Sequence, residues 1–477
     1  MKQSVNQSDK QSDNQKKNDF SKGSVVGNIM KLAVPMTLAQ LINVLYNIVD
    51  RIYIGMIPEN ATLSLTGLGL CLPIISIVIA FANLFGMGGA PLCSIERGRG
   101  NEKEAEAIMG NSFVMMVAVG ILLTVLGLMF KRPMLYLFGA SDATISYADA
   151  YVTVYLMGNI FVMTGLGMNS FINSQGFGTV GMMTVLLGAV TNIVLDLFFV
   201  VVLHLDVFGV ALATVLSQVV SAVLVSISLL RPGSIYSVVP REVRFYREKL
   251  AAILRIGVPA GIQSNMYTIS NMVLQSRMNL FGTVTVAAWT AFEKIDGFYF
   301  MISSAFGVSI TTFVSQNFGA QKYQRLRKGV RACLALTFGV TLFISLLYCL
   351  GSPILLRLFS SDSEVISLGT HMMWYISPFY FMFVCIEIFS GTARGAGDSL
   401  KPMLMTCGGV CVLRVAWVVV VLSNYPALET ILVSYPISWG ITSLLYLIYY
   451  FRGNWLRRGI AKAGFPAEED RDSTAAK

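Results

Sequence analysis

The sequence predicts an all-α, polytopic membrane protein with twelve transmembrane helices in two pseudo-symmetric six-helix lobes. Three observations lead to this fold class. Apolar runs of membrane-spanning length fill most of the chain, lysines and arginines are concentrated in alternate loops, and the first half of the sequence recurs in the second half.

The apolar runs exclude an ordinary soluble or disordered protein. Of the 477 residues, 55% are hydrophobic and only 13% are charged, whereas soluble domains carry about 25% charged residues. A transmembrane helix needs about 20 mostly apolar residues. Twelve such runs fall at about 30–56, 63–93, 108–130, 150–174, 181–203, 207–230, 253–281, 285–317, 330–352, 369–393, 403–424 and 429–451.

The positions of lysine and arginine fix the expected orientation. When both termini are placed in the cytoplasm, 28 of the 35 Lys and Arg residues fall in cytoplasmic segments and only three in external loops. Positively charged loops stay in the cytoplasm, so this arrangement predicts an even number of spans. The net charge of +9 then reflects topology and contact with anionic lipid headgroups. A nucleic-acid partner has no support.

The two halves of the chain share short motifs at a nearly constant offset. KLAVP ending at Pro35 matches RIGVP ending at Pro259, and the Leu-Phe pair at 137–138 matches that at 358–359. SQGFG at 174–178 likewise matches ARGAG at 393–397. Both halves begin inside, so the repeats are parallel, an arrangement in which transporters often place substrate between halves that rock against each other.

The repeat and the polar segments together predict the domain organisation. Residues 1–24 are almost wholly polar, which predicts a disordered tail. The segments expected in order are a cytoplasmic tail (1–24), an N-lobe (25–230), a basic linker (231–252), a C-lobe (253–451) and a cytoplasmic C-tail (452–477).

Four polar side chains of the first half are expected at a similar depth in the membrane. Asp196 lies roughly 22 Å along its helix from the inner side, and Thr214 roughly 10 Å along the next helix from the outer side. Asp50 falls in the outer third of its span, and Asn192 shares a helix face with Asp196. Buried carboxyl groups that change protonation, beside amide and hydroxyl oxygens, predict a cation-coupling site. The alternative is that these groups only hydrogen-bond one helix to another.

Further polar groups are candidates for a substrate cavity. Gln40, Asn43 and Asn47 form one polar stripe with Asp50 on the first helix. Glu387 and Arg414 lie in neighbouring spans of the second half, where a structural ion pair or contact with substrate are both open. Glu293, Lys294 and Asp296 are expected in water at the outer end of the eighth span.

No metal site or disulfide framework is expected. The seven cysteines show no CxxC spacing, and the two histidines, His204 and His371, have no partner at ligand spacing.

In this order and spacing the motifs resemble the multidrug and toxic compound extrusion (MATE) family over residues 25–455. They are VDRIYIG after Pro35, NIVLD at 192–196, GVALAT at 209–214, SQNFGA at 315–320 and ARGAGD at 393–398. The pattern is most similar to the branch of MepA-type multidrug exporters of Gram-positive bacteria. The resemblance implies a twelve-helix antiporter of a bacterial plasma membrane that exchanges an inward cation for an outward organic compound.

The resemblance also implies individual roles. Pro35 bends the first helix, and Asp50, Asn192, Asp196 and Thr214 bind the coupling cation. The sodium-coupled branch carries a glutamate about eight residues after the seventh helix's proline, but here that place is near Tyr267. A proton is therefore the expected coupling ion, with Na⁺ at the same residues as the alternative. The expected partners are small organic cations or amphipathic drugs and membrane lipid. We expect a monomer and no cofactor.

Three other functions are considered. Flipping of lipid or lipid-linked sugar is the nearest rival, but such flippases often have two more spans and a strongly cationic cavity, whereas Arg277 and Arg414 are the only deep cations here. An intramembrane enzyme would need a nucleophile with a base, a carboxylate dyad or a metal set, and the sequence suggests none. A passive channel would not require titratable groups gathered in one lobe.

Overall fold

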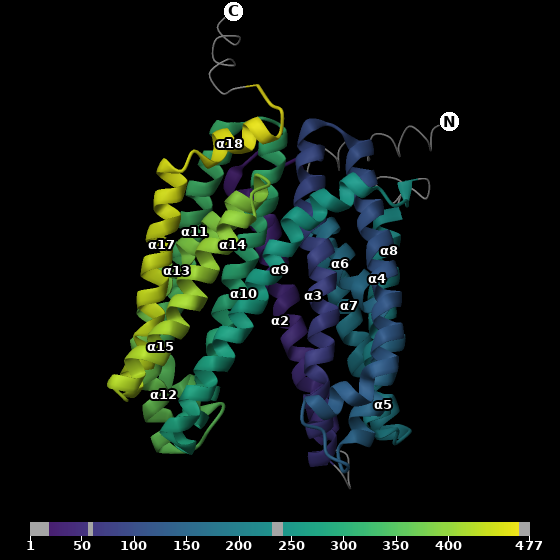
Figure 1. Ribbon diagram of the computed structural model, residues 1–477, viewed down its shortest axis with the longest axis vertical. Helices are drawn as coiled ribbons and strands as arrows, with labels where there is room; N and C mark the ends of the chain where they lie inside the picture. The colour runs from purple at the N-terminus through teal and green to yellow at the C-terminus, as the bar shows by residue number, and fades with distance from the viewer. Residues whose placement is uncertain (1–18, 56–60, 231–241, 467–477) are drawn as a thin grey trace, which may run out of the picture. The chain divides into compact units, whose positions relative to one another are not determined.

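The computed structural model describes residues 19–55, 61–230 and 242–466 (Figure 1). Within these ranges the chain is helical and contains no β-strand, so the predicted fold class is confirmed. The helices of the first half are α2 (Val25–Gly55), α3 (Ala61–Arg99), α4 (Glu102–Leu137), α5 (Ile145–Met157), α6 (Asn159–Ser174), α7 (Gly178–Asp196), η1 (Leu197–Val202) and α8 (Asp206–Leu230).

The second half repeats this order. Its helices are α9 (Arg247–Met278), η3 (Asn279–Phe281), α10 (Thr283–Gly319), α11 (Tyr323–Arg357), α12 (Ser363–Ile376), η4 (Ser377–Phe379), α13 (Tyr380–Gly395), α14 (Leu400–Thr406), η5 (Cys407–Val412), α15 (Leu413–Asn424), α16 (Leu428–Leu432), α17 (Ser434–Arg452) and α18 (Trp455–Lys462). Corresponding helices end at matching places, such as α6 at Ser174 and α13 at Gly395.

The predicted spans can be matched to these helices. Among the described residues, ten helical segments are long and apolar enough to cross a membrane, and the pair α5 and α6, bent by 58° at its break, makes an eleventh. The one predicted span still to be matched, the seventh in the chain, corresponds to α9. Its 32 residues are long enough to cross a membrane, although its composition is more polar. The bend in the fourth span falls at Gly158, a break that the continuous apolar run did not predict.

The chain divides into two compact units. Unit 1 contains residues 34–258 of the described chain, and unit 2 contains residues 20–33 and 259–466. The first turns of α2 therefore group with the second half, and the first turns of α9 with the first half. Both boundaries between the units lie beside the repeated prolines. One falls between Ala33 and Val34, next to Pro35, and the other falls between Val258 and Pro259.

Both predicted tails and the predicted linker differ in part from the structure. Residues 1–18, 231–241 and 467–477 lie outside the described residues, but residues 20–24 of the expected disordered tail are held on unit 2. Phe20 is fully buried there, and its carbonyl accepts hydrogen bonds from Asn317 Nδ2 at 3.2 Å and Arg325 Nε at 3.0 Å. The predicted linker overlaps the start of α9, and the predicted C-tail contains α18. Composition alone did not show these contacts.

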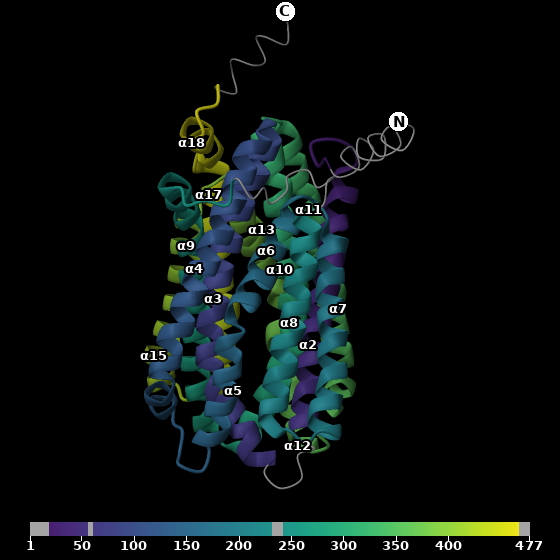
Figure 2. The same cartoon turned by 90° about the vertical axis from the view of Figure 1, so that its right-hand side faces the viewer.

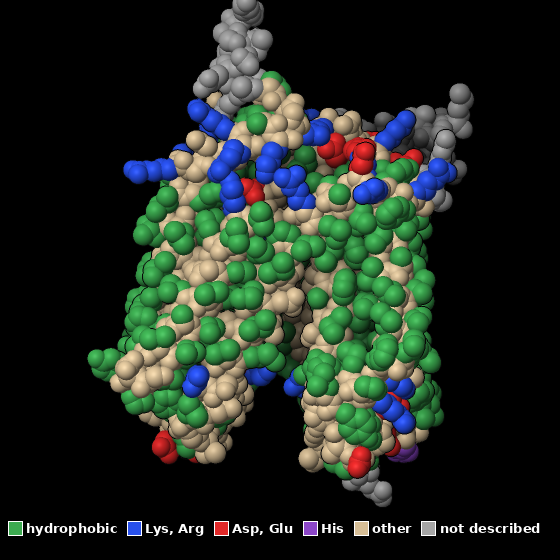
Figure 3. Space-filling view, in the orientation of Figure 1, with side chains coloured by type: hydrophobic (Ala, Val, Ile, Leu, Met, Phe, Trp, Pro, Cys, Tyr) green, Lys and Arg blue, Asp and Glu red, His purple; other side chains and the backbone are tan. Residues whose placement is uncertain are grey.

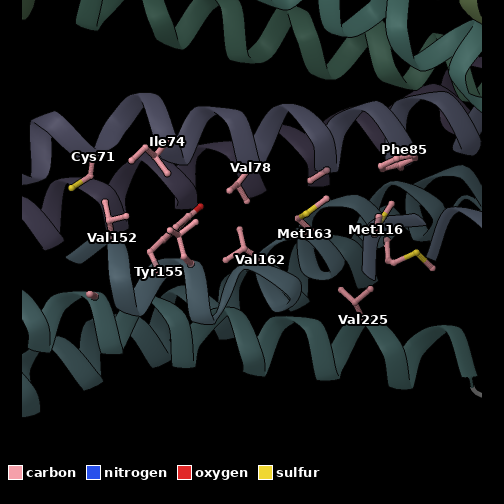
Figure 4. Close-up of a cluster of buried hydrophobic side chains, with 14 of the residues drawn as sticks. Cys71, Ile74, Val78, Phe85, Met116, Val152, Tyr155, Val162, Met163 and Val225 are labelled. Carbon is pink, nitrogen blue, oxygen red and sulfur yellow. The ribbon is translucent and has the colours of Figure 1, made fainter. Parts of the chain in front are cut away.

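The core of unit 1 is built from apolar side chains of several helices (Figure 4). Phe85 on α3, Met116 on α4, Tyr155 on α5 and Val225 on α8 belong to one buried cluster. α7 and α8 lie side by side in the same unit (Figure 2). This packing fixes the helices that carry the predicted site residues.

Side-chain types follow the expected membrane arrangement within each unit. Hydrophobic side chains cover the outer flanks of the helices, and Lys and Arg gather at one end of each unit (Figure 3). In unit 2 this end carries the start of α11 and α18, the segments that the Lys and Arg distribution assigned to the cytoplasm.

Candidate functional site

Two carboxyl groups of unit 1 lie against each other inside the helix bundle. Asp50 comes from α2 and Asp196 is the last residue of α7, where the π-helical turn η1 begins. The two side chains interact directly, and they are only 8% and 0% exposed respectively. π-helical turns are rare and often mark functional sites.

Neither carboxyl group has a cationic partner among the residues that the structure describes. Among the described residues no ion pair involves Asp50 or Asp196. Both carboxyl oxygens of Asp196 and one of Asp50 also lack a hydrogen-bond donor in this part of the chain. Two carboxylates in contact cannot both stay ionised without a large energetic cost. The pair is therefore chemically suited to hold a proton or another small cation.

Asn192 and Thr214 add further unpaired polar atoms to the buried part of unit 1. Asn192 lies one helical turn before Asp196 on α7, and Thr214 lies on α8. Both amide atoms of Asn192 and the hydroxyl of Thr214 are buried without a hydrogen-bond partner among the residues that the structure describes. Buried polar groups are nearly always hydrogen-bonded, so these orphaned atoms point to a guest such as a cation or water.

Two tyrosines next to the carboxyl pair were not predicted from the sequence. Tyr46 on α2 and Tyr151 on α5 both lie close enough to Asp50 to interact with it electrostatically, and Tyr151 also lies beside Thr214. A tyrosine in an apolar helix is ordinary packing in a sequence. Only the fold shows that these two side chains lie near Asp50.

The polar stripe of α2 is divided between a cavity and the surface. Gln40, Asn43 and Tyr46 line a cavity of about 160 Å³ in unit 1, which Asn192 also lines. Asn47 is exposed and lies outside this lining, and its Nδ2 donates to the carbonyl of Asn43 at 2.6 Å. Gln40 and Asn43 remain cavity candidates, whereas Asn47 does not line this cavity.

Pro35 lies inside α2, which runs as one continuous helix on both sides of it. A proline cannot donate the hydrogen bond to the carbonyl four residues earlier, so α2 has one backbone bond fewer at this point.

Unit 2 contains a larger cavity that both predicted second-half residues line. It measures about 530 Å³, and its wall includes Glu387, Arg414, Tyr435 and Trp439. Ligand pockets typically measure about 300–1,000 Å³, so a drug-sized compound fits this cavity and not the smaller one. The wall combines aromatic rings with charges of both signs.

Of the two alternatives for Glu387 and Arg414, the ion pair is not found among the described residues, whereas both side chains line the cavity. Arg414 donates from Nε and Nη2 to Ser438 Oγ at 3.1 and 2.9 Å, and its guanidinium lies 4.0 Å from the ring centre of Tyr435. Among the described residues no ion pair joins it to a carboxylate. Similar depth in neighbouring helices did not determine the direction of the side chains.

The acidic cluster on α10 also differs from its prediction. Asp296 is buried rather than in water, and it accepts a hydrogen bond from the Tyr380 hydroxyl. Glu293 and Lys294 line the unit 2 cavity together with it. This cavity therefore contains three acidic side chains.

In the part of the chain that the structure describes, no three carboxylates, thiolates or imidazoles lie in an arrangement that could hold one metal ion. Sodium bound at the carboxyl pair would take its ligands from Asp50, Asp196, Asn192 and Thr214. These are oxygen donors, the ligand type that hard cations prefer.

Comparison with protein families finds one match in each half. The MatE family pattern covers residues 35–198 and 259–420. The chain is 24% identical over 452 residues to the probable multidrug resistance protein YoeA of Bacillus subtilis, covering 93% of this chain and 96% of that protein. It is 25% identical over 432 residues to the multidrug export protein MepA of Staphylococcus saprophyticus, covering 87% and 95%.

Solved structures share the fold. One describes the outward-facing conformation of a multidrug resistance MATE family transporter of the MOP superfamily, with a TM-score of 0.85, 21% identity, and coverage of 92% of this chain and 98% of that one. A MOP superfamily transporter from Pyrococcus furiosus gives a TM-score of 0.84 at 20% identity, with coverage of 92% and 98%.

Proposed function

Since this chain belongs to the MatE family of membrane transporters, we propose that it is a secondary antiporter that exports hydrophobic or cationic organic compounds in exchange for H⁺. The relatives named for multidrug resistance and export span nearly its whole length, which supports multidrug efflux from a bacterial cell across the plasma membrane. As a member of this family the protein is a transporter rather than an enzyme.

The observation that carries the proposal is the buried Asp50–Asp196 pair. In the outward-open state a proton enters from outside and neutralises the pair, and in the inward-open state it leaves to the cytoplasm. Asn192 and Thr214 supply polar atoms beside it that are otherwise unpaired. Because these groups belong to one unit, binding and release of the proton change the charge inside that unit alone.

The organic substrate occupies the 530 Å³ cavity of unit 2. Aromatic faces attract organic cations, and Trp289, Tyr435 and Trp439 are among the rings in its wall. Glu387 provides a negative charge for a cationic group, and Arg414 sets a limit on how much positive charge the cavity accepts. Gln40 and Asn43 contribute polar groups to the small cavity of unit 1.

The test is dye efflux from proteoliposomes under an imposed pH gradient. Asp196→Asn keeps the size of the side chain but cannot bind and release a proton, so proton-driven efflux is lost while the protein remains folded and inserted. Asp206→Asn is the matched control, because Asp206 is exposed at the start of α8 and asparagine accepts its positive φ of 47°. Unchanged efflux in Asp196→Asn would overturn the coupling role.

Sodium coupling and lipid flipping are distinguished in the same vesicles. Efflux driven by a sodium gradient and not by a pH gradient would replace H⁺ by Na⁺ at the same residues. Movement of a labelled lipid or lipid-linked sugar, without movement of organic cations, would assign the chain to flipping instead.

Two further expectations belong to this proposal. We propose that both termini lie in the cytoplasm, as the Lys and Arg distribution predicts, and that the monomer is the transporting unit. Labelling of single cysteines introduced near each terminus with an impermeant reagent, and the mass of the purified protein, test the two statements.

A further inference from the structure

A second cavity of unit 2 is unrelated to the sites described above. It measures about 320 Å³ and is formed by α11, α13, α17, α18 and the turn between the last two helices. Its lining includes Arg327, Arg331, Tyr450, Phe451, Trp455 and Arg457. It lies at the end of unit 2 where basic side chains gather (Figure 3).

Three arginines line this one cavity. Arg327 and Arg331 are four residues apart on α11 and therefore share a helix face, and Arg457 comes from α18. Arginine is the residue that proteins favour for binding carboxylate and phosphate groups. The planar, multiply donating guanidinium binds phosphate oxygens in pairs, which makes phosphate the best-matched anion.

The rest of the lining is aromatic and leads to an apolar surface. Tyr450 packs between Phe389, at 4.6 Å between ring centres, and Trp455, at 5.5 Å. Phe451 is 73% exposed, and Ile448, one turn earlier on α17, is 51% exposed. Exposed apolar side chains below a layer of Trp and Tyr are typical of the boundary between headgroups and hydrocarbon. The wall of the cavity is therefore first cationic, then aromatic, and leads in space to an apolar surface.

The helix α18 completes this cavity instead of lying freely on a membrane. Its sequence alternates apolar and basic residues like a membrane-surface helix, but Trp455, Leu456 and Ile460 are buried in unit 2. The indole Nε1 of Trp455 also donates to the carbonyl of Tyr450 at 3.1 Å. The apolar face of α18 is thereby used within the protein, and Arg457 is held at the cavity.

We propose that this cavity is a binding site for an anionic phospholipid of the cytoplasmic leaflet. The phosphate lies among the three arginines, the glycerol region contacts Tyr450 and Trp455, and the acyl chains follow the exposed face of α17. The order of surfaces carries this assignment, because a soluble phosphate compound uses the arginines but not the apolar wall. The inference depends on the proposed orientation and not on the coupling ion or the exported compound.

Binding is measured on the purified full chain in a neutral detergent. The probe is phosphatidylglycerol with brominated acyl chains, which quench a nearby tryptophan. Quenching of Trp455 is isolated by subtracting the signal of Trp455→Phe, because the chain has 5 tryptophans. We expect saturable quenching by phosphatidylglycerol and none by brominated phosphatidylcholine.

The arginines are tested as a pair against a charge-matched control. Arg327→Ala with Arg331→Ala weakens phosphatidylglycerol binding about thirtyfold, since each basic group near an anionic lipid contributes about fivefold. Lys328→Ala with Arg452→Ala removes the same charge from exposed neighbours outside the lining and changes binding by less than about threefold. Equal loss in both double variants would show general surface attraction and overturn the site.

Two more arms make the result decisive. Arg327→Lys with Arg331→Lys keeps the charge and the fold but cannot form paired contacts, so it binds more weakly than the wild type and more tightly than the alanine pair. Glycerol 3-phosphate displaces the lipid only at far higher concentration. Displacement of the lipid by glycerol 3-phosphate at an equal concentration would overturn the assignment to a lipid. Equal affinities for phosphatidylcholine and phosphatidylglycerol would also overturn it.

Discussion

Replacement of Arg414 by methionine tests whether organic cations bind in the 530 Å³ cavity. Arg414 is only 3% exposed, and its interactions include two hydrogen bonds to Ser438 and ring contacts with Tyr435 and Trp439. These contribute roughly 2–5 kcal/mol, while burying the charge without a carboxylate partner costs several kcal/mol. The two effects nearly cancel, so Arg414→Met is expected to change the free energy of unfolding by no more than about 2 kcal/mol.

Removal of the Arg414 charge is expected to change the affinity for a bound cation strongly. A sphere with the volume of the cavity, 530 Å³, is about 10 Å across, so a ligand charge lies roughly 8 Å from the guanidinium. At an effective dielectric constant of about 20, two unit charges at that distance repel by about 2 kcal/mol. Removing Arg414 therefore tightens the binding of a monovalent aromatic cation by about thirtyfold, because 1.36 kcal/mol corresponds to a factor of ten.

The assay is equilibrium binding of a fluorescent monovalent cation to purified protein, with thermal unfolding measured on the same samples. Arg414→Lys keeps the charge and should leave the dissociation constant within about threefold of the wild type. Glu387→Gln removes a negative charge from the same cavity and should weaken binding by a similar factor. Unchanged affinity in both Arg414→Met and Glu387→Gln would refute the placement of the cation in this cavity.

Three changes test the packing of the fold. Gly89→Ala places a Cβ 2.6 Å from a phenylalanine ring atom and a serine hydroxyl, and should lower the free energy of unfolding by about 1–3 kcal/mol. Gly69→Ala on the same helix is the control, because its Cβ meets nothing within 4 Å and should not lower the free energy of unfolding. Equal melting temperatures of the two variants would contradict the packing around Gly89. Tyr380→Phe leaves a buried carboxylate without its hydroxyl donor and should cost about 1–3 kcal/mol, measured by thermal unfolding. Phe20→Ala empties a fully buried site in unit 2 and should lower the free energy of unfolding by about 3–5 kcal/mol. A variant as stable as the wild type would show that the segment before α2 does not pack against unit 2.

The fold was largely predictable because membrane insertion imposes strong rules on sequence. Length and hydropathy of the runs predicted the spans, and the Lys and Arg distribution predicted that their number is even. The break at Gly158 was missed because one glycine in an apolar run carries no signal. The docking of Phe20 was missed because it depends on Asn317 and Arg325, about 300 residues away in the chain.

The site was predictable to the extent that the depth of each side chain in the membrane follows from the rise per residue of a helix. This calculation placed Asp50 and Asp196 at similar depth, and the structure brings their side chains together. Depth says nothing about rotation about the helix axis or about rotamers. For that reason Tyr151 was missed beside Asp50, and an ion pair between Glu387 and Arg414 stayed open as an alternative although Arg414 turns to Ser438.

The proposed exchange of a proton for an organic compound requires that the two binding events influence each other, and we propose α2 as the route for that influence. It is one continuous helix that carries Asp50 in unit 1, yet its first turns, through Ala33, belong to unit 2. Pro35 lies where the helix passes from one unit to the other and removes a backbone hydrogen bond there. The backbone of α2 also approaches its neighbours less closely than the other long helices of unit 1 do. In this proposal, a proton that changes the charge at Asp50 acts on a helix whose first turns belong to the unit with the proposed substrate cavity. The same helix lacks one backbone hydrogen bond at Pro35.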